Sequence, residues 1–177
     1  TTGSALSANP EAMLEGGRLH RKIQRTQNAT YQSEVPLKME WQEEGYILVL
    51  EGRADGIDRM NLEEENVIYV DEIKCVYRNI EEIEEADFLH LAQAKCYAYM
   101  YGHKYDLEKI GIQITYCHLE TEEIKRIFSV YSMEELSLWF ADLLDSYRMW
   151  ASYYVAARKQ RNESIKQLKF PFDFRPG

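Results

Sequence analysis

Three consecutive stretches of the chain are strand-like, and the first alternates apolar and polar residues with the period of two that is typical of β-strands. They cover residues 32–41, 46–53 and 67–76, and short polar connections separate them. Because the connections are short, we expect the three strands to form an antiparallel meander. The third stretch is apolar on both faces, which predicts a central place in the sheet.

The chain before these strands has a helical pattern. Asn9-Pro10-Glu11 is typical of a helix start, with a capping side chain, a proline in the first turn and an acidic residue beside it. Gly16-Gly17 predicts a break or an offset in that helix, because glycine weakens helices. A second helical stretch is then expected from Arg18 to about Gln27.

The pattern after residue 86 is helical, then extended, then helical again. Residues 87–104 predict a helix, and residues 110–117 and 124–131 predict a hairpin. Ser132 and Glu135 form the pattern of a capping box that opens a long last helix. The two helices have apolar stripes, which we expect to pack in the core: Leu89, Ala92, Cys96 and Met100 in the first, and Leu136, Phe140, Leu143, Tyr147, Trp150 and Tyr154 in the second.

The order helix, three strands, helix, two strands, helix predicts an α/β layered domain. With 177 residues, of which 45% are hydrophobic, the chain can form one domain with a core. No apolar run approaches the roughly 18 residues of a membrane span, so we expect no membrane partner. Three widely spaced cysteines favour a reducing cytoplasm over a disulfide framework or a clustered metal clip.

The charge is unevenly distributed. A net charge of −9 argues against simple coating of nucleic acid. From residue 147 to the end, however, the chain has seven basic residues and only two acidic ones. This basic region could follow phosphates or could be an ordinary solvated helix end, and the sequence favours neither interpretation.

Candidate chemistry lies where two of the expected strands end in charged residues. Asp55 follows the second strand, and Glu72 and Lys74 lie near the end of the third. Strand periodicity places Glu72 and Lys74 on the same face, with Asp71 and Ile73 on the other. Two carboxylates beside one ammonium group can hold a divalent metal ion and support hydrolysis, whereas Asp55 alone would be equally typical of an Asp-Gly turn.

These residues resemble the active-site motif of the PD-(D/E)xK nuclease superfamily, in which an acidic residue precedes an acidic-x-Lys element on the next strand. Two further elements are similar to those of RecB-type nuclease domains. They are Gly17-x-x-His20 near the start and Gln93-x-x-x-Tyr97 on the following helix. The resemblance implies a restriction-endonuclease-like core, which is a mixed sheet of about five strands flanked by helices.

The resemblance also implies a function. Asp55, Glu72, the carbonyl of Ile73 and His20 would bind Mg²⁺ or Mn²⁺, and the histidine nitrogen favours Mn²⁺. Lys74 would act on the water or the transition state, with Gln93 and Tyr97 positioning substrate, so Asp55, Glu72, Lys74, Gln93 and Tyr97 are the expected catalytic set. The expected activity is DNA hydrolysis by an exonuclease in repair or recombination. Alternatives are an inactive nuclease-fold module that binds DNA or a helicase, and a structure-specific endonuclease.

The ends of the chain define the expected domain limits. Residues 1–9 read as a tail or a cloning remnant, and residues 10–169 as the nuclease domain. Residues 170–177, Phe-Pro-Phe-Asp-Phe-Arg-Pro-Gly, resemble the lead-in to helicases related to DinG and XPD, which implies a helicase domain further along a longer chain. Some RecB-type relatives carry an iron–sulfur cluster on four cysteines. We expect none here, because Cys75, Cys96 and Cys117 are too few and differently spaced.

Overall fold

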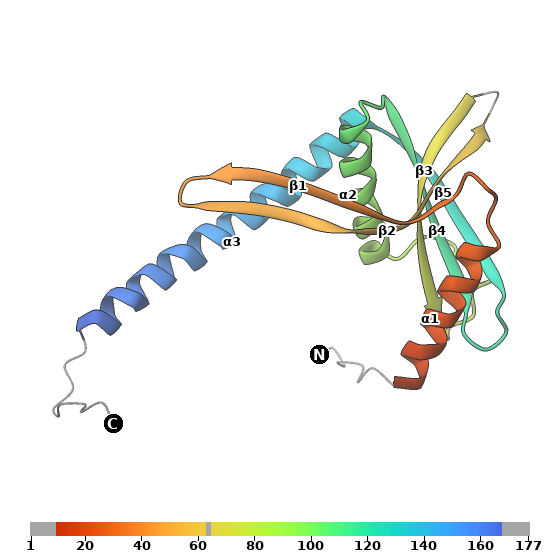
Figure 1. Ribbon diagram of the computed structural model, residues 1–177, viewed down its shortest axis with the longest axis horizontal. Coiled ribbons are helices and arrows are strands. Elements are labelled where there is room, and N and C mark those ends of the chain that lie inside the picture. The colour runs from red at the N-terminus through yellow and green to blue at the C-terminus, as the bar shows by residue number, and fades with distance from the viewer. Residues whose placement is uncertain (1–9, 63–64, 168–177) are drawn as a thin grey trace. The chain divides into compact units, whose positions relative to one another are not determined.

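The computed structural model describes residues 10–62 and 65–167. The expected tail of residues 1–9 and the helicase-like segment 170–177 therefore lie outside the described residues. The elements follow one another in the order that the sequence predicts (Figure 1). They are α1 (Pro10–Arg25), β1 (Gln32–Glu43), β2 (Tyr46–Leu62), β3 (Glu65–Val76), α2 (Phe88–Lys104), β4 (Lys109–His118), β5 (Ile124–Ser132) and α3 (Met133–Gln167).

The five strands form one mixed sheet in the order β1-β2-β3-β4-β5. Strands β1, β2 and β3 pair antiparallel, β3 and β4 pair parallel, and β4 and β5 pair antiparallel. This confirms the meander, the hairpin and the central place of the third strand. The parallel pair needs a crossover connection, which contains α2. The α/β class with a mixed five-stranded sheet is therefore established.

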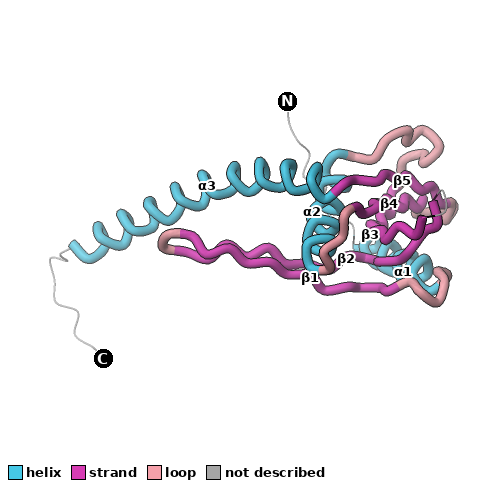
Figure 2. Tube along the Cα trace, turned by 90° about the horizontal axis from the view of Figure 1, so that it is seen from above, coloured by secondary structure: helices cyan, strands magenta, loops and turns pink. Residues whose placement is uncertain are grey.

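Helices α1 and α2 cover opposite faces of β3. Leu19 and Ile23 of α1 belong to a buried cluster with Ile73, whereas Ala94 and Ala98 of α2 belong to a larger one with Val70. Because successive strand residues point to alternate faces, positions 70 and 73 face opposite ways. Figure 2, seen from above, shows the two helices on either side of the central strands. A site on β3 can therefore receive side chains from both helices.

Helix α1 runs without interruption from Pro10 to Arg25, so the expected break at Gly16-Gly17 is wrong. Gly16 lies against β3, where the Cys75 thiol lies 3.6 Å from the Gly16 carbonyl oxygen. Two glycines cost the helix roughly 1 kcal/mol each relative to alanine. Leu19 and Ile23, which are 1% and 3% exposed, offset that cost by packing on the sheet.

Strand β2 extends nine residues past the expected end at Arg53, to Leu62. Asp55 therefore lies inside a strand, and Asp55-Gly56 forms no turn. The reason is long-range pairing: Ile57 lies opposite Val70 of β3, and both are buried. Packing of this kind outweighs the weak local preference of Asp-Gly for turns.

The expected apolar stripe of α2 is partly wrong. Leu89 is 71% exposed, and of the four stripe residues only Met100 is buried. The helix buries Ala94, Ala98 and Tyr101 instead. Small alanine side chains let the helix axis approach the sheet closely, so the contact face follows size as well as hydrophobicity.

The chain separates into two compact units, the first ending at Ser137 and the second beginning at Leu138. The capping box at the start of α3 is confirmed, since the Glu135 N–H donates to Ser132 Oγ and the Ser132 N–H donates to Glu135 Oε2, at 3.2 and 2.8 Å. No helix in the described ranges has both the length and the hydropathy needed to cross a bilayer.

In the second unit, the expected core packing of the stripe is wrong for Leu143, which is 43% exposed, and for three of its aromatic residues. Tyr147, Trp150 and Tyr154 are 52%, 58% and 53% exposed. Their rings contact one another along the helix, with Trp150 stacked on Tyr154 at a centroid distance of 5.6 Å. The periodicity is real, but a helical stripe alone does not specify what covers it.

Candidate functional site

The site begins where β2 loses its regular pairing at Asp55. Pairing with β3 ends at Gly56 opposite Asp71, and pairing with β1 skips from Gly56 to Ala54. Ala54 and Ile57 belong to the same core cluster although they are three residues apart. A regular strand would point them to opposite faces, so the strand is locally distorted between them. This distortion leaves Asp55 outside the strand register, where it bonds with groups of other elements.

Asp55 joins three elements. Its Oδ2 accepts the Ile73 N–H of β3 at 2.7 Å and lies 3.0 Å from His20 Nε2 of α1. Its carbonyl oxygen accepts a hydrogen bond from the Gln24 side chain at 2.9 Å. Because an extended residue projects its N–H and C=O to the same side, the Ile73 carbonyl faces Asp55 as well. The three sequence-predicted residues His20, Asp55 and Ile73 are therefore brought together.

His20 is held in place by its neighbours in α1. Leu19 and Ile23 anchor the helix in the core, and His20 follows at the border of that buried face, with its side chain 22% exposed. The hydrogen bond to Asp55 raises the pKa of His20, although partial burial works against this. The carboxylate thus orients the ring and stabilises its protonated form in the absence of a cation.

Glu72 is the most unusual group in the site. Its side chain is 1% exposed, and Oε1 lies 2.7 Å from Lys74 Nζ. The other oxygen, Oε2, is buried without a hydrogen-bond partner. Burial, followed by the negative charge of Asp55, raises the pKa of Glu72 to about 7, and the Lys74 hydrogen bond opposes this rise only in part. An unsatisfied buried carboxylate oxygen is costly, so the geometry fits a missing cationic partner.

The Lys74 side chain extends from β3 of the sheet toward α2. Its ammonium group contacts Glu72 and also donates to Gln93 Oε1 at 3.1 Å. This confirms that Glu72 and Lys74 point the same way. Tyr97, one turn further along α2, lies instead over Gly52 of β2, where an added Cβ would approach its hydroxyl to 2.8 Å. Gly52 thus makes room for Tyr97, and α2 spans both strands that carry the carboxylates.

Glu34 of β1 is an acidic neighbour that the sequence analysis missed. One ligand atom each from His20, Glu34 and Asp55 lie within 4.8 Å of one another. Nothing in the local pattern identifies Glu34, because it reads as one more polar position of an alternating strand. Only the register of β1 with β2, in which Ser33 lies opposite Gly56 and Val35 opposite Ala54, could have suggested that position 34 lies near Asp55.

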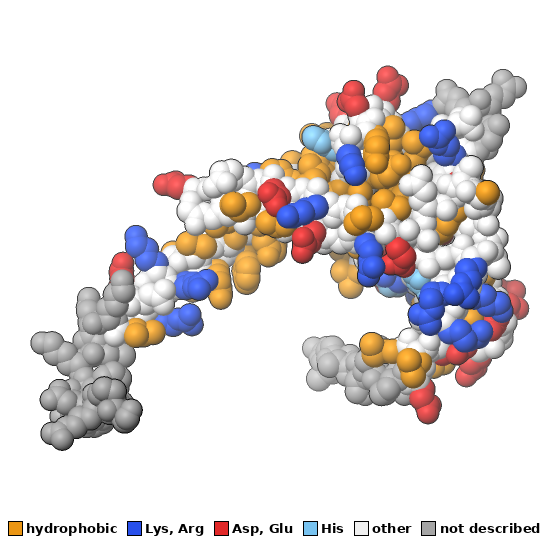
Figure 3. Space-filling view, in the orientation of Figure 1, with side chains coloured by type: hydrophobic (Ala, Val, Ile, Leu, Met, Phe, Trp, Pro, Cys, Tyr) orange, Lys and Arg blue, Asp and Glu red, His pale blue; other side chains and the backbone are white. Residues whose placement is uncertain are grey.

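The exposed face of α1 is basic, which the overall charge of −9 conceals. Arg18, Arg21, Lys22 and Arg25 are all exposed on the helix that carries His20. Figure 3 shows these basic side chains gathered over α1. Arg18 and Lys22 form ion pairs with Glu122 of the β4–β5 turn. The result is a positive surface beside the histidine.

Two further polar residues near the site have structural roles. Asp71 is fully buried on the face opposite Glu72 and accepts hydrogen bonds from Tyr31, Gln113 and Thr115. Burial raises its pKa, and these three donors oppose that rise. His90 Nδ1 lies 3.0 Å from the buried Tyr116 hydroxyl, a contact that holds its ring against the core.

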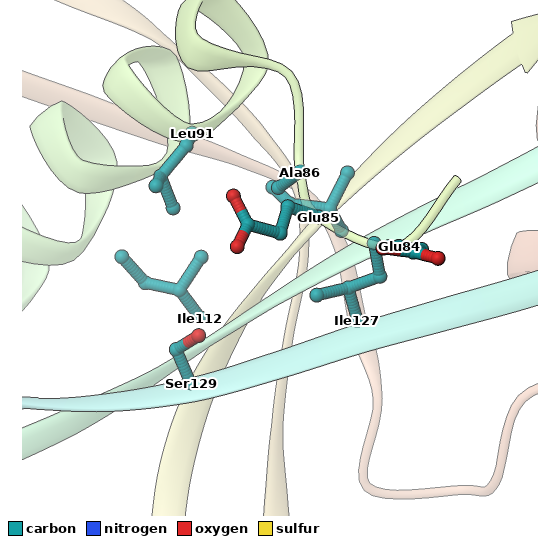
Figure 4. Close-up of a pocket in the computed structure, with 8 residues that line it drawn as sticks. Glu84, Glu85, Ala86, Leu91, Ile112, Ile127 and Ser129 are labelled. Atoms are coloured by element: carbon teal, nitrogen blue, oxygen red, sulfur yellow. The ribbon is translucent and has the colours of Figure 1, made fainter. Parts of the chain in front are cut away.

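Two hollows in the described part of the chain lie near the site, and neither is lined by Asp55 or Glu72. One of about 300 Å³ lies between α2, β4, β5 and the segment before α2. In Figure 4 the Glu85 side chain points into it, toward Leu91 and Ile112, while Glu84 points away. A more open hollow of about 590 Å³ borders the site at Gly52 and includes Lys38 and Lys104.

Neither a family model nor a curated protein matches the sequence. A solved structure described as the crystal structure of SSO0001 is similar over 67% of this chain, with 22% identity and a TM-score of 0.44. The matched region spans half of that chain.

Proposed function

We propose that this protein is a divalent-metal-dependent deoxyribonuclease of the PD-(D/E)xK type, acting as an exonuclease. The observation that carries the proposal is the buried Glu72 carboxylate, whose Oε2 has no partner and which interacts electrostatically with Asp55 and His20. A purely structural role gives no reason to bury a carboxylate oxygen without a partner, since an apolar residue of similar size would pack at lower cost.

Asp55, Glu72, His20 and the Ile73 carbonyl are the groups that would hold the ion. Three oxygens and one imidazole nitrogen suit Mn²⁺ and, less closely, Mg²⁺. When bound, such an ion lowers the pKa of water and offsets negative charge on a phosphate. The Ile73 N–H already fixes Asp55, so the donors are oriented before any ion arrives.

Lys74 supplies the fixed positive charge. Glu72 and Gln93 hold its ammonium group from two sides, which orients it without burying it fully. From this place it would donate a hydrogen bond to a phosphate oxygen or to the attacking water. Gln93 keeps Lys74 in position, and Tyr97 packs against Gly52, which is one of the residues that line the hollow.

DNA is the substrate that the surrounding charges favour. The basic face of α1 lies beside His20, and Lys38 and Lys104 line the hollow on the other side. A polyanion could therefore cross the site with contacts on both sides. The three free thiols fit the cytoplasm as the compartment. The resemblance of residues 170–177 to a helicase lead-in implies a helicase domain in the same longer chain, and we include that domain in the proposal on this ground.

The test is a cleavage assay on linear and circular DNA with Mn²⁺, Mg²⁺ or EDTA. We expect cleavage of linear DNA that EDTA abolishes, and a loss of about 10²-fold or more in rate for Lys74→Ala. Cleavage of closed circles would favour the endonuclease alternative. Metal-insensitive DNA binding without cleavage by the wild-type protein would contradict the proposal and favour an inactive binding module.

A further inference from the structure

Glu34 has a backbone conformation that glutamate rarely adopts. Its φ is +56°, in the left-handed region, although β1 pairs with β2 on both sides of it, at Ser33 and at Val35. The Cβ of an ordinary residue disfavours this region, and glycine or asparagine usually occupies it. A strained residue inside an otherwise regular strand points to a local requirement.

The strain places a carboxylate beside the site. Glu34, His20 and Asp55 each offer a ligand atom within 4.8 Å of the others. The Gln24 side chain donates both to Glu34 Oε1, at 3.0 Å, and to the Asp55 carbonyl, at 2.9 Å. Gln24 therefore ties the strained residue to the backbone of the central carboxylate.

Surface pairing does not account for this arrangement. Arg53 Nε lies 3.3 Å from Glu34 Oε2, but the arginine side chain is 67% exposed. Exposed ion pairs contribute little, and one between neighbouring strands needs no left-handed backbone. A separate observation also indicates a cation here. The Oε2 atom of Glu72 is buried without a hydrogen-bond partner, and the carboxyl group interacts electrostatically with the same Asp55. The carboxylates of Glu34 and Asp55 converge beside one histidine, with the charge of Glu72 close enough to interact with Asp55, and such groups repel one another unless a cation offsets their charge.

We propose that Glu34 is an additional metal ligand, supplied by β1, and that its strained backbone is retained for that purpose. The inference rests on the proposed function, because it concerns the same site. It adds a residue that lies outside the motifs that the sequence resembles. The donor set then includes a carboxylate from each of three adjacent strands, β1, β2 and β3.

The test measures binding of Mn²⁺ alone by calorimetry, together with the thermal midpoint of the metal-free protein. Glu34→Gln should weaken Mn²⁺ binding about tenfold or more. Glu34→Gly should weaken it as much and leave the midpoint equal or higher, because glycine accepts a positive φ. Asp106→Gly is the matched control, since Asp106 also has a positive φ, of 51°, in the turn after α2. It should raise the midpoint without changing Mn²⁺ affinity.

The outcomes separate this inference from the proposed function. If both Glu34 variants bind Mn²⁺ within twofold of the wild-type protein, Glu34 is no ligand, and the nuclease proposal stands without it. A clear fall in the midpoint of Glu34→Gly would overturn the statement about strain. If the wild-type protein binds no Mn²⁺, both proposals are wrong.

Discussion

At the scale of single residues, the behaviour of Glu72 follows from one buried oxygen. In a core, an acidic side chain is stable only when donors or cations satisfy both oxygens. Lys74 satisfies Oε1, and in the described structure nothing satisfies Oε2. The residue is therefore a source of instability, and in the proposed function it is the group that would gain most from a bound cation.

The first prediction concerns pH. The folded-state pKa of Glu72, about 7, lies above its unfolded value of 4.5. Between these values the folded state keeps a proton that the unfolded state releases, so the free energy of unfolding falls as pH rises, by roughly 3 kcal/mol. Glu72→Gln should remove most of this fall. Urea unfolding in EDTA from pH 4 to 8 measures it, and equal slopes for both proteins would contradict the prediction.

In Glu72→Gln, a smaller fall in the free energy of unfolding with rising pH should persist because of His20. Its pKa is raised by Asp55, so its stabilising contribution is complete below pH 6.5 and is lost as pH rises through the folded-state value. Both groups must lose protons before they bind a cation. The stabilisation by added Mn²⁺ should therefore grow from pH 6 to pH 8. Stabilisation that is independent of pH would argue against these two ligands.

The second prediction concerns Gly52 and Tyr97. Gly52→Ala should destabilise the protein by about 1 kcal/mol, because the new Cβ would lie 2.8 Å from the Tyr97 hydroxyl. The same change in a Tyr97→Ala background should cost almost nothing, since the clash is gone. A double-mutant cycle by urea unfolding measures this coupling. Equal costs in the two backgrounds would show that Tyr97 does not contact Gly52.

The sequence predicted the centre of the site better than its rim. Asp55, Glu72 and Lys74 could be found because charged residues next to apolar strands are costly and therefore conspicuous. His20 and Gln93 needed the resemblance to a known motif. Glu34 could not be found, because its role depends on strand register and on a left-handed backbone, and neither leaves a signal in an alternating pattern.

At the scale of elements, local preferences fail where tertiary packing is strong. The Gly16-Gly17 pair does not break α1, and Asp55-Gly56 does not end β2. In both cases buried apolar residues follow within a few positions and hold the element together. The capping box of α3, by contrast, forms as expected, because it depends only on contacts within four residues.

The third prediction tests this account of α1. Gly17→Ala should stabilise the protein by up to about 1 kcal/mol, because an added Cβ would meet only the flexible Arg21 side chain, at 3.5 Å. Thermal or urea unfolding measures the gain. Gly56→Ala provides the contrast: its Cβ would overlap the Tyr31 ring, so this variant should be clearly destabilised. A loss of stability in Gly17→Ala would show that α1 needs a flexible centre.

At the scale of the whole molecule, every candidate site residue lies in the first of the two units. The second unit is the part of α3 from Leu138 onward, and its aromatic stripe is largely exposed. The α/β class, the meander and the hairpin followed from the pattern, and the resemblance implied the mixed five-stranded sheet. The parallel pairing of β3 with β4 and the exposure of the stripe appear only in the structure, because a helical pattern does not specify its partner.

The fourth prediction concerns this division. A chain that ends at Leu144 should fold cooperatively and bind Mn²⁺ within twofold of the full chain, since it keeps the buried Leu136 and Phe140 and removes mainly exposed side chains. Circular dichroism and calorimetry measure the two properties. Loss of folding on truncation would show that the second unit stabilises the first.

The central claim is that the carboxylates of Asp55 and Glu72 share a divalent cation. The most direct measurement is anomalous diffraction from crystals grown with Mn²⁺. We predict a manganese peak within about 2.5 Å of an oxygen of each residue, with Glu72 Oε2 as one ligand. A protein that takes up no manganese there, and leaves that oxygen without a partner, would contradict the account.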